Sequence, residues 1–366
     1  MINNPFKNTH HNSFYDKVKI TFFTLSGIAI IRFILVMFLL VLSSLLIYLF
    51  LLGYETKDKL GNYNNISPIR RTFLLIPQVL ARIILFILGY YWINEEFQEY
   101  KFFKFNYLER TSSPKLIIAN HVSFIDTFYF LIRGYPSIVI SANTLNLPII
   151  GLVLKKMVPI LVPSNESQRL SLPNAKEQIN NRLTHSSIKN FNRPLLIFPE
   201  GSTKNSKYLL KFQNGAFNNK IKMQPILLNY KYKYLDPSWT LDANIYKLLY
   251  LMCCQVVNYL DVIYLEPTDM NANEIRKKFI SKLNLIDSSL SNHDNHFIRK
   301  NIDKFDYIYK YVYEDGLYNI EYYKKKYNLH YEKINELINE FYILDTKKIG
   351  KLKNLISFND FLTNSL

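Results

Sequence analysis

The first third of the chain is dominated by long apolar stretches. No charged residue occurs from Phe33 to Gly53, and a helix of that length covers about 30 Å, the hydrocarbon thickness of a bilayer. The apolar stretch begins at Ile20 and is interrupted by Gly27 and Arg32. A straight helix from Ile20 is too long for one perpendicular span, so we expect a kink, a tilt or an in-plane first part. The length of the stretch and the lack of a small-residue cleavage site argue against a removed signal peptide. We therefore expect a retained membrane anchor.

A second apolar stretch runs from Phe73 to Ile93 and is less regular. It contains Pro77, Arg82 and Gly89, and it ends in three aromatic residues, Tyr90 to Trp92. An arginine near the middle of a membrane span costs a few kcal/mol, so a re-entrant or interfacial hairpin competes with a second span. The aromatic residues suit the headgroup layer. The number of membrane crossings stays open.

Beyond about residue 100 the pattern changes to short β-rich runs separated by helix-length segments such as Asn146–Lys156 and Asn174–Leu183. The expected strands are Lys115–Ala119, Ser137–Ser141, Pro159–Val162, Pro194–Phe198, Met223–Asn229 and Val262–Leu265. This alternation predicts an α/β fold with a largely parallel sheet flanked by helices. Functional residues in such sheets gather beyond the carboxyl ends of the strands.

The first polar strand end is Asn120–Asp126, with the sequence NHVSFID. On one regular helix, side chains five positions apart point in different directions, so His121 and Asp126 would not meet. If the strand ends at Asn120 and a helix starts after Ser123, the chain reversal can bring imidazole and carboxylate together. The carboxylate would then fix the tautomer of a general base. The alternative is a capping box, in which Asp126 only closes the helix N-terminus at Ser123.

The second polar strand end is Pro199–Thr203, which follows the apolar run Leu195–Phe198. Pro199 ends the ladder, Gly201 permits a positive φ, and Ser202 or Thr203 can cap a helix. Exposed amides and hydroxyls at such a turn suit a phosphate. The alternative is an ordinary strand-to-helix turn with a solvated Glu200.

Together, an NHxxxxD segment and a later FPEGS segment resemble the glycerolipid acyltransferase family, membrane enzymes that acylate lysophospholipids from acyl-CoA. Further blocks are similar to its lysophosphatidylcholine and lysophosphatidylethanolamine acyltransferase branch: Leu147–Gly151, Val158–Val162, Phe212–Phe217 and Met223–Tyr230. The chain departs from this branch at two places. Pro163 and Ser164 stand where the branch usually carries an arginine, and Gln213 replaces the lysine of F-K-x-G-A-F.

The resemblance implies acyl transfer without a protein nucleophile. His121, oriented by Asp126, acts as general base on a lysolipid hydroxyl, which attacks the thioester of acyl-CoA. Glu200 and Gly201 help to seat the polar head of the acceptor, Ser202 and Thr203 are neighbours, and Arg169 contacts its phosphate. Acyl-CoA is a co-substrate, and no cofactor or metal is implied. Candidate cations for the CoA are Lys155, Lys156 and Lys204, each with a solvated surface position as the alternative.

The resemblance also implies an integral membrane protein of the endoplasmic reticulum, with the catalytic domain facing the cytoplasm. We divide the chain into a membrane-anchoring region (1–100), an acyltransferase domain (101–290) and a helical C-terminal extension (291–366). Two other functions stay open. One is a lysophosphatidate or glycerol-3-phosphate acyltransferase, and the other is a catalytically inactive, membrane-anchored lipid-binding protein.

The composition of the chain limits the classes of binding partner. The chain has 366 residues, with 45 Lys+Arg against 29 Asp+Glu, and a net charge of +16. This charge suits nucleic acid, an anionic membrane or an acidic small molecule. The apolar N-terminal stretches favour the membrane, and no nucleic-acid-binding motif accompanies the charge.

Cys253 and Cys254 are adjacent in an apolar run, which predicts two buried thiols and no disulfide scaffold. The Cys, His and carboxylate spacings offer no metal site.

The last part of the chain, from about residue 301, is polar, tyrosine-rich and predicted to be helical. Asp345 and Gly350 match the first and sixth positions of a calcium-binding EF-hand loop, as found in relatives of this branch. Lys347, Ile349 and Ile356 stand where such a loop needs oxygen ligands, so we expect no calcium binding here.

Overall fold

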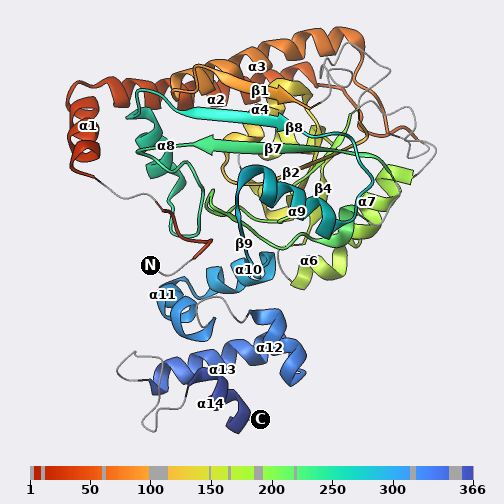
Figure 1. The fold of residues 1–366 in the computed structure, drawn as a ribbon. Coiled ribbons are helices and arrows are strands. Elements are labelled where there is room, and N and C mark those ends of the chain that lie inside the picture. The colour runs from red at the N-terminus through yellow and green to blue at the C-terminus, as the bar shows by residue number, and fades with distance from the viewer. Residues whose placement is uncertain are drawn as a thin grey trace.

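Seven strands form one twisted sheet at the centre of the protein (Figure 1). The computed structural model describes residues 4–9, 13–59, 63–98, 114–147, 150–163, 166–184, 193–217, 221–313, 319–345 and 357–365. Neighbouring strands of this sheet are parallel except for β7 and β8. In spatial order the strands are β1 (Ile93–Phe97), β8 (Tyr259–Tyr264), β7 (Met223–Lys231), β2 (Leu116–Ala119), β5 (Leu195–Ile197), β3 (Ser137–Ser141) and β4 (Ile160–Val162). The predicted α/β fold with a largely parallel sheet is confirmed.

Each of the six strands expected from the sequence is present, with ends that differ by a few residues. Strand β1 was not expected, because its sequence Ile-Asn-Glu-Glu-Phe has few apolar residues and directly follows the second apolar stretch. It pairs with β8 at the edge of the sheet and is half exposed. An edge strand with one solvated face tolerates such polar positions.

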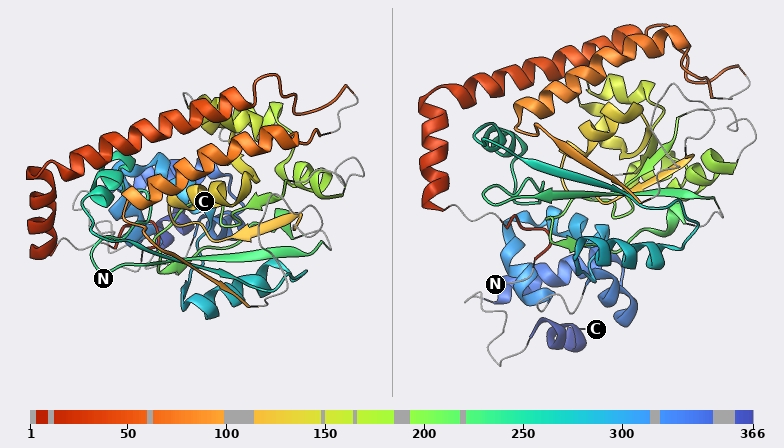
Figure 2. Two further views of the ribbon diagram at one scale, coloured as in Figure 1. Left: turned by 90° about the horizontal axis from the view of Figure 1, so that it is seen from above. Right: turned by 45° about the horizontal axis from the view of Figure 1, so that its top comes forward.

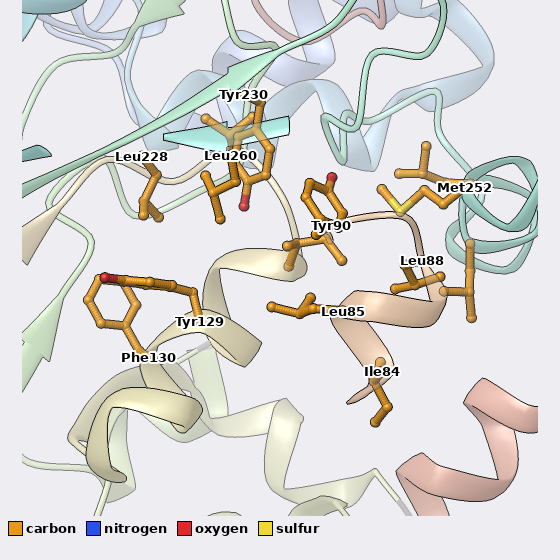
Figure 3. Close-up of a cluster of buried hydrophobic side chains, with 14 of the residues drawn as sticks. Ile84, Leu85, Leu88, Tyr90, Tyr129, Phe130, Leu228, Tyr230, Met252 and Leu260 are labelled. Atoms are coloured by element: carbon orange, nitrogen blue, oxygen red, sulfur yellow. The ribbon is translucent and has the colours of Figure 1, made fainter. Parts of the chain in front are cut away.

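Helices cover both faces of the sheet. Ile117 and Ala119 point to the face covered by α2 (Ile28–Phe50), α3 (Pro68–Ile87), α4 (Ile125–Gly134) and α8 (Ile245–Cys253). Leu116 and Ile118 point to the opposite face, against α7 (Ala175–Thr184) and α9 (Ala272–Leu283). This alternation along β2 is the period of two that a strand imposes on its side chains. Figure 3 shows part of the first cluster, where residues of α3, α4 and α8 meet the sheet.

The N-terminal apolar stretch forms two helices rather than one. Helix α1 (Phe14–Leu25) ends at Ser26, and α2 begins after Gly27, whose φ of 75° is left-handed. Of the kink, tilt or in-plane first part that we expected for this stretch, the structure contains a kink, and it lies at Gly27. Helix α2 then lies alongside α3 across the top of the domain (Figure 2). Among the described residues, α2 is the one helix long and apolar enough to cross a membrane by length and composition.

The second apolar stretch forms α3, which ends at Ile87, and the chain then passes directly into β1. Arg82 in this helix donates to the carbonyl oxygens of Tyr90 and Tyr91, at 2.9 and 2.6 Å. Arg32 in α2 similarly donates to the carbonyl oxygens of Cys253 and Gln255, at 3.2 and 2.9 Å. Both arginines that interrupt the apolar stretches therefore bind main-chain oxygens of the folded domain.

The C-terminal residues form a second, helical core below the sheet (Figure 1). The predicted helical character is seen throughout their described part, although positions 346–356 of the EF-hand-like loop lie outside it. The helices are α10 (Asn292–Lys300), α11 (Phe305–Tyr307), the π-helix η5 (Ile308–Val312), α12 (Ile320–Tyr327), α13 (Tyr331–Leu344) and α14 (Phe358–Ser365).

Shorter elements complete the fold. They are η1 (Ala142–Asn146), α5 (Ile150–Lys156), α6 (Glu166–Ser171), η3 (Asn214–Ala216), η4 (Ile302–Lys304) and the two-stranded pair β6 (Tyr208–Leu209) and β9 (Ile286–Asp287). Cys253 and Cys254 are free and buried, as predicted. The division of the chain near residues 100 and 290 stays a prediction, and the first boundary falls beside residues 99–113, outside the described part.

Candidate active site

His121 and Asp126 meet at the carboxyl end of β2. The strand ends at Ala119, α4 begins at Ile125, and the turn between them places His121 Nδ1 2.8 Å from Asp126 Oδ2. The Asp126 side chain is fully buried, whereas that of His121 is 20% exposed. With Nδ1 on the carboxylate, Nε2 is the ring nitrogen left to exchange a proton with a ligand. The turn therefore brings the imidazole of His121 and the carboxylate of Asp126 together.

Asp126 also binds the main chain of the turn that precedes α4. Its Oδ2 accepts from the backbone N–H of Val122 at 2.8 Å and from that of Ser123 at 3.0 Å. Ser123 Oγ in turn accepts from Ile125 N at 3.4 Å. Only one half of the expected capping box is formed, since the Ser123 N–H binds Asp126 whereas Ser123 Oγ does not accept from Asp126 N, and the N-cap of α4 is Phe124. The hydrogen bonds to the turn hold the Asp126 carboxylate where it reaches the imidazole.

An aromatic ring fixes the plane of the imidazole. Phe198, directly after β5, stacks on His121 with ring centroids 4.1 Å apart and an interplanar angle of 14°. Phe130 of α4 packs edge-on against Phe198. Our sequence reasoning missed Phe198 as a site residue, although its place directly before the Pro199 turn was a usable signal.

Glu200 lies level with His121 because β2 and β5 are parallel neighbours in register. Its Oε1 accepts from His121 N at 3.0 Å, and its Oε2 accepts from Leu210 N at 3.0 Å. Lys204 Nζ lies 3.7 Å from Oε1, and both side chains are fully buried. Burial raises the pKa of the Glu200 carboxyl, while Lys204 and the two N–H groups act in the opposite direction. Glu200 thus holds the main chain at His121 from the protein interior.

The turn after Glu200 differs from the sequence expectation in one respect. Gly201 has the positive φ that was predicted, 73°. No helix follows it, so Ser202 and Thr203 do not cap one. Thr203 Oγ1 instead donates to the carbonyl oxygen of Trp239, and Ser202 Oγ is buried. The helix prediction was wrong because the chain turns inward here, where the Asn205 side chain donates to main-chain oxygens of the N-terminal segment.

The candidate cations occupy different environments. Arg169 lies in α6, but its side chain is outside the described part. Lys155 is exposed at the end of α5, and Lys156 Nζ donates to Tyr54 O at 2.9 Å. Lys204 is neither solvated nor open to a CoA, since it lies beside Glu200 in the interior. Gln213 is exposed, and its N–H donates to Pro199 O at 2.8 Å, which places it beside the Glu200 turn.

Tyr230 is a further residue that the sequence reasoning did not assign to the site. It lies on β7, and its hydroxyl donates to Asp126 Oδ1. Its position directly after the predicted strand Met223–Asn229 was the signal that could have identified it. No group of three or more His, Cys, Asp and Glu side chains suited to a metal ion occurs within the described ranges.

Comparisons with known proteins identify acyltransferases as similar to this chain. Residues 101–231 match the family model described as Acyltransferase. The chain is 28% identical to lysophospholipid acyltransferase LPEAT1 of Arabidopsis thaliana, over 72% of this chain and 77% of that protein. It is 29% identical to LPEAT2 of the same plant, over 78% of this chain and 51% of that protein. A lysophosphatidylcholine acyltransferase of Drosophila melanogaster is 30% identical over 50% of this chain and 35% of that protein.

Among solved structures, the 1-acyl-sn-glycerophosphate acyltransferase PlsC of Thermotoga maritima covers 74% of this chain at 13% identity, with a TM-score of 0.39. The chain spans about half or less of the length of LPEAT2 and of the Drosophila relative. The family match falls on the segment that carries both strand ends, His121 with Asp126 and Glu200 with Gly201. Residues 101–231 therefore form a match to an acyltransferase domain, and the chain is similar to lysophospholipid acyltransferases.

Proposed function

We propose that this protein transfers an acyl chain from acyl-CoA to the free hydroxyl of a lysophospholipid in the membrane. The observation that carries the proposal is the buried Asp126 carboxylate 2.8 Å from Nδ1 of a partly exposed His121, at the carboxyl end of a parallel strand. The names of the plant and insect relatives, lysophospholipid and lysophosphatidylcholine acyltransferases, support the choice of a lysophospholipid as acceptor.

The chemistry requires no protein nucleophile. His121 Nε2 removes the proton of the acceptor hydroxyl as its oxygen attacks the thioester carbonyl carbon. The C–S bond then breaks, and the imidazolium returns the proton to the CoA sulfur. Asp126 stabilises the imidazolium between these two steps. General-base catalysis of this kind contributes about 10²–10⁴ in rate, and positioning of the two substrates supplies further acceleration.

The acceptor head lies, in this proposal, over the turn formed by Gly201, Ser202 and Thr203, with Gln213 beside it, and Arg169 is the residue that we expect to contact its phosphate. Glu200 supports this surface from the interior and does not contact the acceptor, because its side chain is fully buried and its two oxygens bind main-chain N–H groups. A choline or ethanolamine phosphodiester carries one negative charge, whereas a phosphomonoester carries about −1.5 to −2. The replacement of two family cations by Pro163 or Ser164 and by Gln213 therefore favours a zwitterionic head group.

Membrane attachment belongs to the same proposal. Large apolar side chains are exposed along α1, α2 and α3, and Trp92 follows them. A contiguous apolar face of this kind marks a lipid or protein interaction site. Moving a lysolipid into water costs about 0.8 kcal/mol per exposed CH₂, so a site at the bilayer surface avoids most of that cost. We infer that the catalytic domain lies on the cytoplasmic face of the endoplasmic reticulum.

The test is acyl transfer by the purified full-length protein in lipid–detergent micelles, with a panel of lysophospholipids and acyl-CoAs. We expect turnover with lysophosphatidylcholine or lysophosphatidylethanolamine and release of free CoA thiol in equal amount. A preference of tenfold or more for lysophosphatidate, about 1.4 kcal/mol, would assign the protein to the phosphatidate-forming alternative. No acyl transfer to any acceptor would indicate an inactive lipid-binding protein.

A further inference from the structure

A buried tyrosine lies behind the carboxylate of the His121–Asp126 pair. Tyr230 extends from β7 with its side chain enclosed, and its ring packs edge-on against that of Tyr90, with centroids 6.2 Å apart. Figure 3 shows the two rings together between the sheet and the helices. The Tyr230 hydroxyl donates to Asp126 Oδ1. This contact joins residues 104 positions apart in the sequence.

The two carboxylate oxygens of Asp126 accept hydrogen bonds from different donors. Oδ2 accepts from His121 Nδ1, Val122 N and Ser123 N, all within 3.0 Å. Oδ1 faces away from these groups and accepts from Tyr230. Because the carboxylate is fully buried, an Oδ1 without a donor would carry its full desolvation cost. Tyr230 thus completes the hydrogen bonding of the residue that orients the base.

We propose that Tyr230 is a positioning residue of the active site, whose hydroxyl fixes the Asp126 carboxylate and sets how strongly that carboxylate stabilises protonated His121. The proposal rests on the role of His121 as general base in the proposed function. Tyr230 itself touches neither substrate, because it is enclosed between β7, β8 and the helices on that face.

Tyr230 acts as a fixed donor and not as a proton carrier. Burial raises the pKa of its phenol well above the ordinary value, and the negative charge of Asp126 raises it further. The hydroxyl is therefore protonated throughout the pH range in which histidine titrates. The titratable and charged groups around the His121–Asp126 pair fall into two sets. Asp126 and Glu200 bind His121, and Lys204 lies beside Glu200. Tyr230 and Tyr90 act on Asp126, and Asp236 acts on Tyr90.

The sign of the effect follows from charge distribution. A donor on Oδ1 draws negative charge away from Oδ2, the oxygen that faces the imidazole. Removing this donor concentrates charge on Oδ2, which favours the imidazolium and leaves less free base at a given pH. Tyr230→Phe should therefore move the acid limb of the kcat/KM profile to higher pH by about half a unit to one unit. We expect kcat to fall about tenfold with KM nearly unchanged, since the lost hydrogen bond lies outside the substrate sites.

The experiment follows His121 directly. Full-length protein labelled with ¹⁵N-histidine is titrated in micelles, and the His121 resonance is identified by its loss in His121→Gln. We compare wild type with Tyr230→Phe and with the matched control Tyr264→Phe. Tyr264 is a buried tyrosine of the neighbouring strand β8 whose hydroxyl bonds to that of Tyr129. We expect the titration midpoint to rise in Tyr230→Phe, in step with the acid limb, and to stay at the wild-type value in Tyr264→Phe.

A wild-type midpoint in Tyr230→Phe would overturn the proposal, as would an equal rise in Tyr264→Phe. If Tyr230→Phe does not fold, 3-fluorotyrosine at position 230 decides instead, because a stronger donor must lower the midpoint and an unchanged midpoint contradicts the proposal. The titration needs no turnover. A protein without acyl transfer would thus refute the proposed function and still leave the contribution of Tyr230 measurable.

Discussion

His121 is held by three contacts of different kinds: a side-chain hydrogen bond, a ring stack and a main-chain hydrogen bond. Asp126 holds Nδ1, Phe198 stacks on the ring, and Glu200 holds the backbone N–H. We predict that His121→Ala lowers kcat by about 10²–10⁴, the usual contribution of a general base, with an unchanged thermal unfolding midpoint. Asp126→Asn should keep a residual rate, because an amide oxygen can still orient the ring.

The control for this prediction is His293→Ala, the same chemical change at an exposed position of α10. Acyl-transfer rates of the three variants are measured with one acyl-CoA and one lysophospholipid at saturating concentrations. Wild-type activity in His121→Ala would remove the basis of the mechanism. Equal losses in His121→Ala and His293→Ala would show that the effect does not arise at the site.

A positive charge beside the Glu200 turn should change the preference of the enzyme for one acceptor head group over another. Gln213 is exposed, and its main chain binds Pro199. We predict that Gln213→Lys raises kcat/KM for lysophosphatidate relative to lysophosphatidylcholine by about threefold to tenfold, since a phosphomonoester carries more negative charge. The measurement compares both acceptors with one acyl-CoA, and Gln213→Met provides a control of similar length without charge. An identical acceptor ratio in all three proteins would place Gln213 away from the head group.

Sequence reasoning identified the contact of His121 with Asp126, but it missed Phe198, Tyr230 and the inward direction of Glu200. The pairing of His121 with Asp126 followed from a local turn, so local geometry was sufficient to predict it. The inward direction of Glu200 depends on the register of β2 with β5, and on Lys204 being buried beside it. Tyr230 reaches Asp126 only because β7 pairs with β2. Such long-range contacts leave no periodic signal in the sequence.

At the scale of elements, prediction succeeded wherever apolar and β-branched residues were concentrated. The strands around Ile117, Ile138 and Leu196 are buried on both faces and read as short apolar runs. Strand β1 was not predicted because three of its five residues are polar, which an edge position allows. The turn after Gly201 resembled a helix start, but tertiary contacts with the N-terminal segment redirect the chain there.

Helix α3 is tied to the sheet through one guanidinium. Arg82 donates to the carbonyl oxygens of Tyr90 and Tyr91 just before β1. Hydrogen bonds to a charged group contribute about 1.5–3 kcal/mol. We predict that Arg82→Met lowers the thermal unfolding midpoint in detergent by several degrees, at about 2–4 °C per kcal/mol.

The matched control for Arg82→Met is Arg70→Met. Arg70 lies in the same helix, and its guanidinium donates to Leu52 O in a solvent-exposed position. Hydrogen bonds open to water contribute less, so this variant should unfold close to wild type. Equal midpoints for Arg82→Met and wild type would show that the contact does not stabilise the junction of α3 and β1.

At the scale of the whole molecule, the two ends of the chain meet. Phe6 is fully buried in the core formed by the C-terminal helices, while the neighbouring Asn4 and Lys7 carbonyls accept from Asn205. The N-terminal segment therefore links the C-terminal helices to the loop that follows the Glu200 turn. We predict that Phe6→Ala destabilises the C-terminal helices by about 3–5 kcal/mol. Hydrogen exchange of α12 and α13 measures this effect, and Phe14→Ala, at a position 83% exposed, is the control.

Faster exchange in Phe6→Ala should be accompanied by a modest loss of acyl-transfer activity. Asn205 lies one residue after Lys204, and the N-terminal segment whose carbonyl oxygens it binds is loosened in this variant. Exchange at the wild-type rate would contradict the link between the two ends. Faster exchange in Phe14→Ala as well would indicate a general loosening of the protein and not a specific contact of Phe6.

The apolar face of α1, α2 and α3 should hold the whole molecule at a bilayer. Wild-type protein is expected to float with lipid vesicles and to resist extraction by alkaline carbonate. We predict that Ile34→Asp combined with Phe38→Asp weakens flotation at least tenfold, because both positions on α2 are more than half exposed, at 62% and 59%, and each charge costs about 2.5–3.5 kcal/mol in hydrocarbon. Residual binding through α3 should persist. Ile302→Asp, 49% exposed among the C-terminal helices, is the control and should float like wild type. Clean release of wild-type protein at high pH would show that neither apolar stretch is embedded in the membrane.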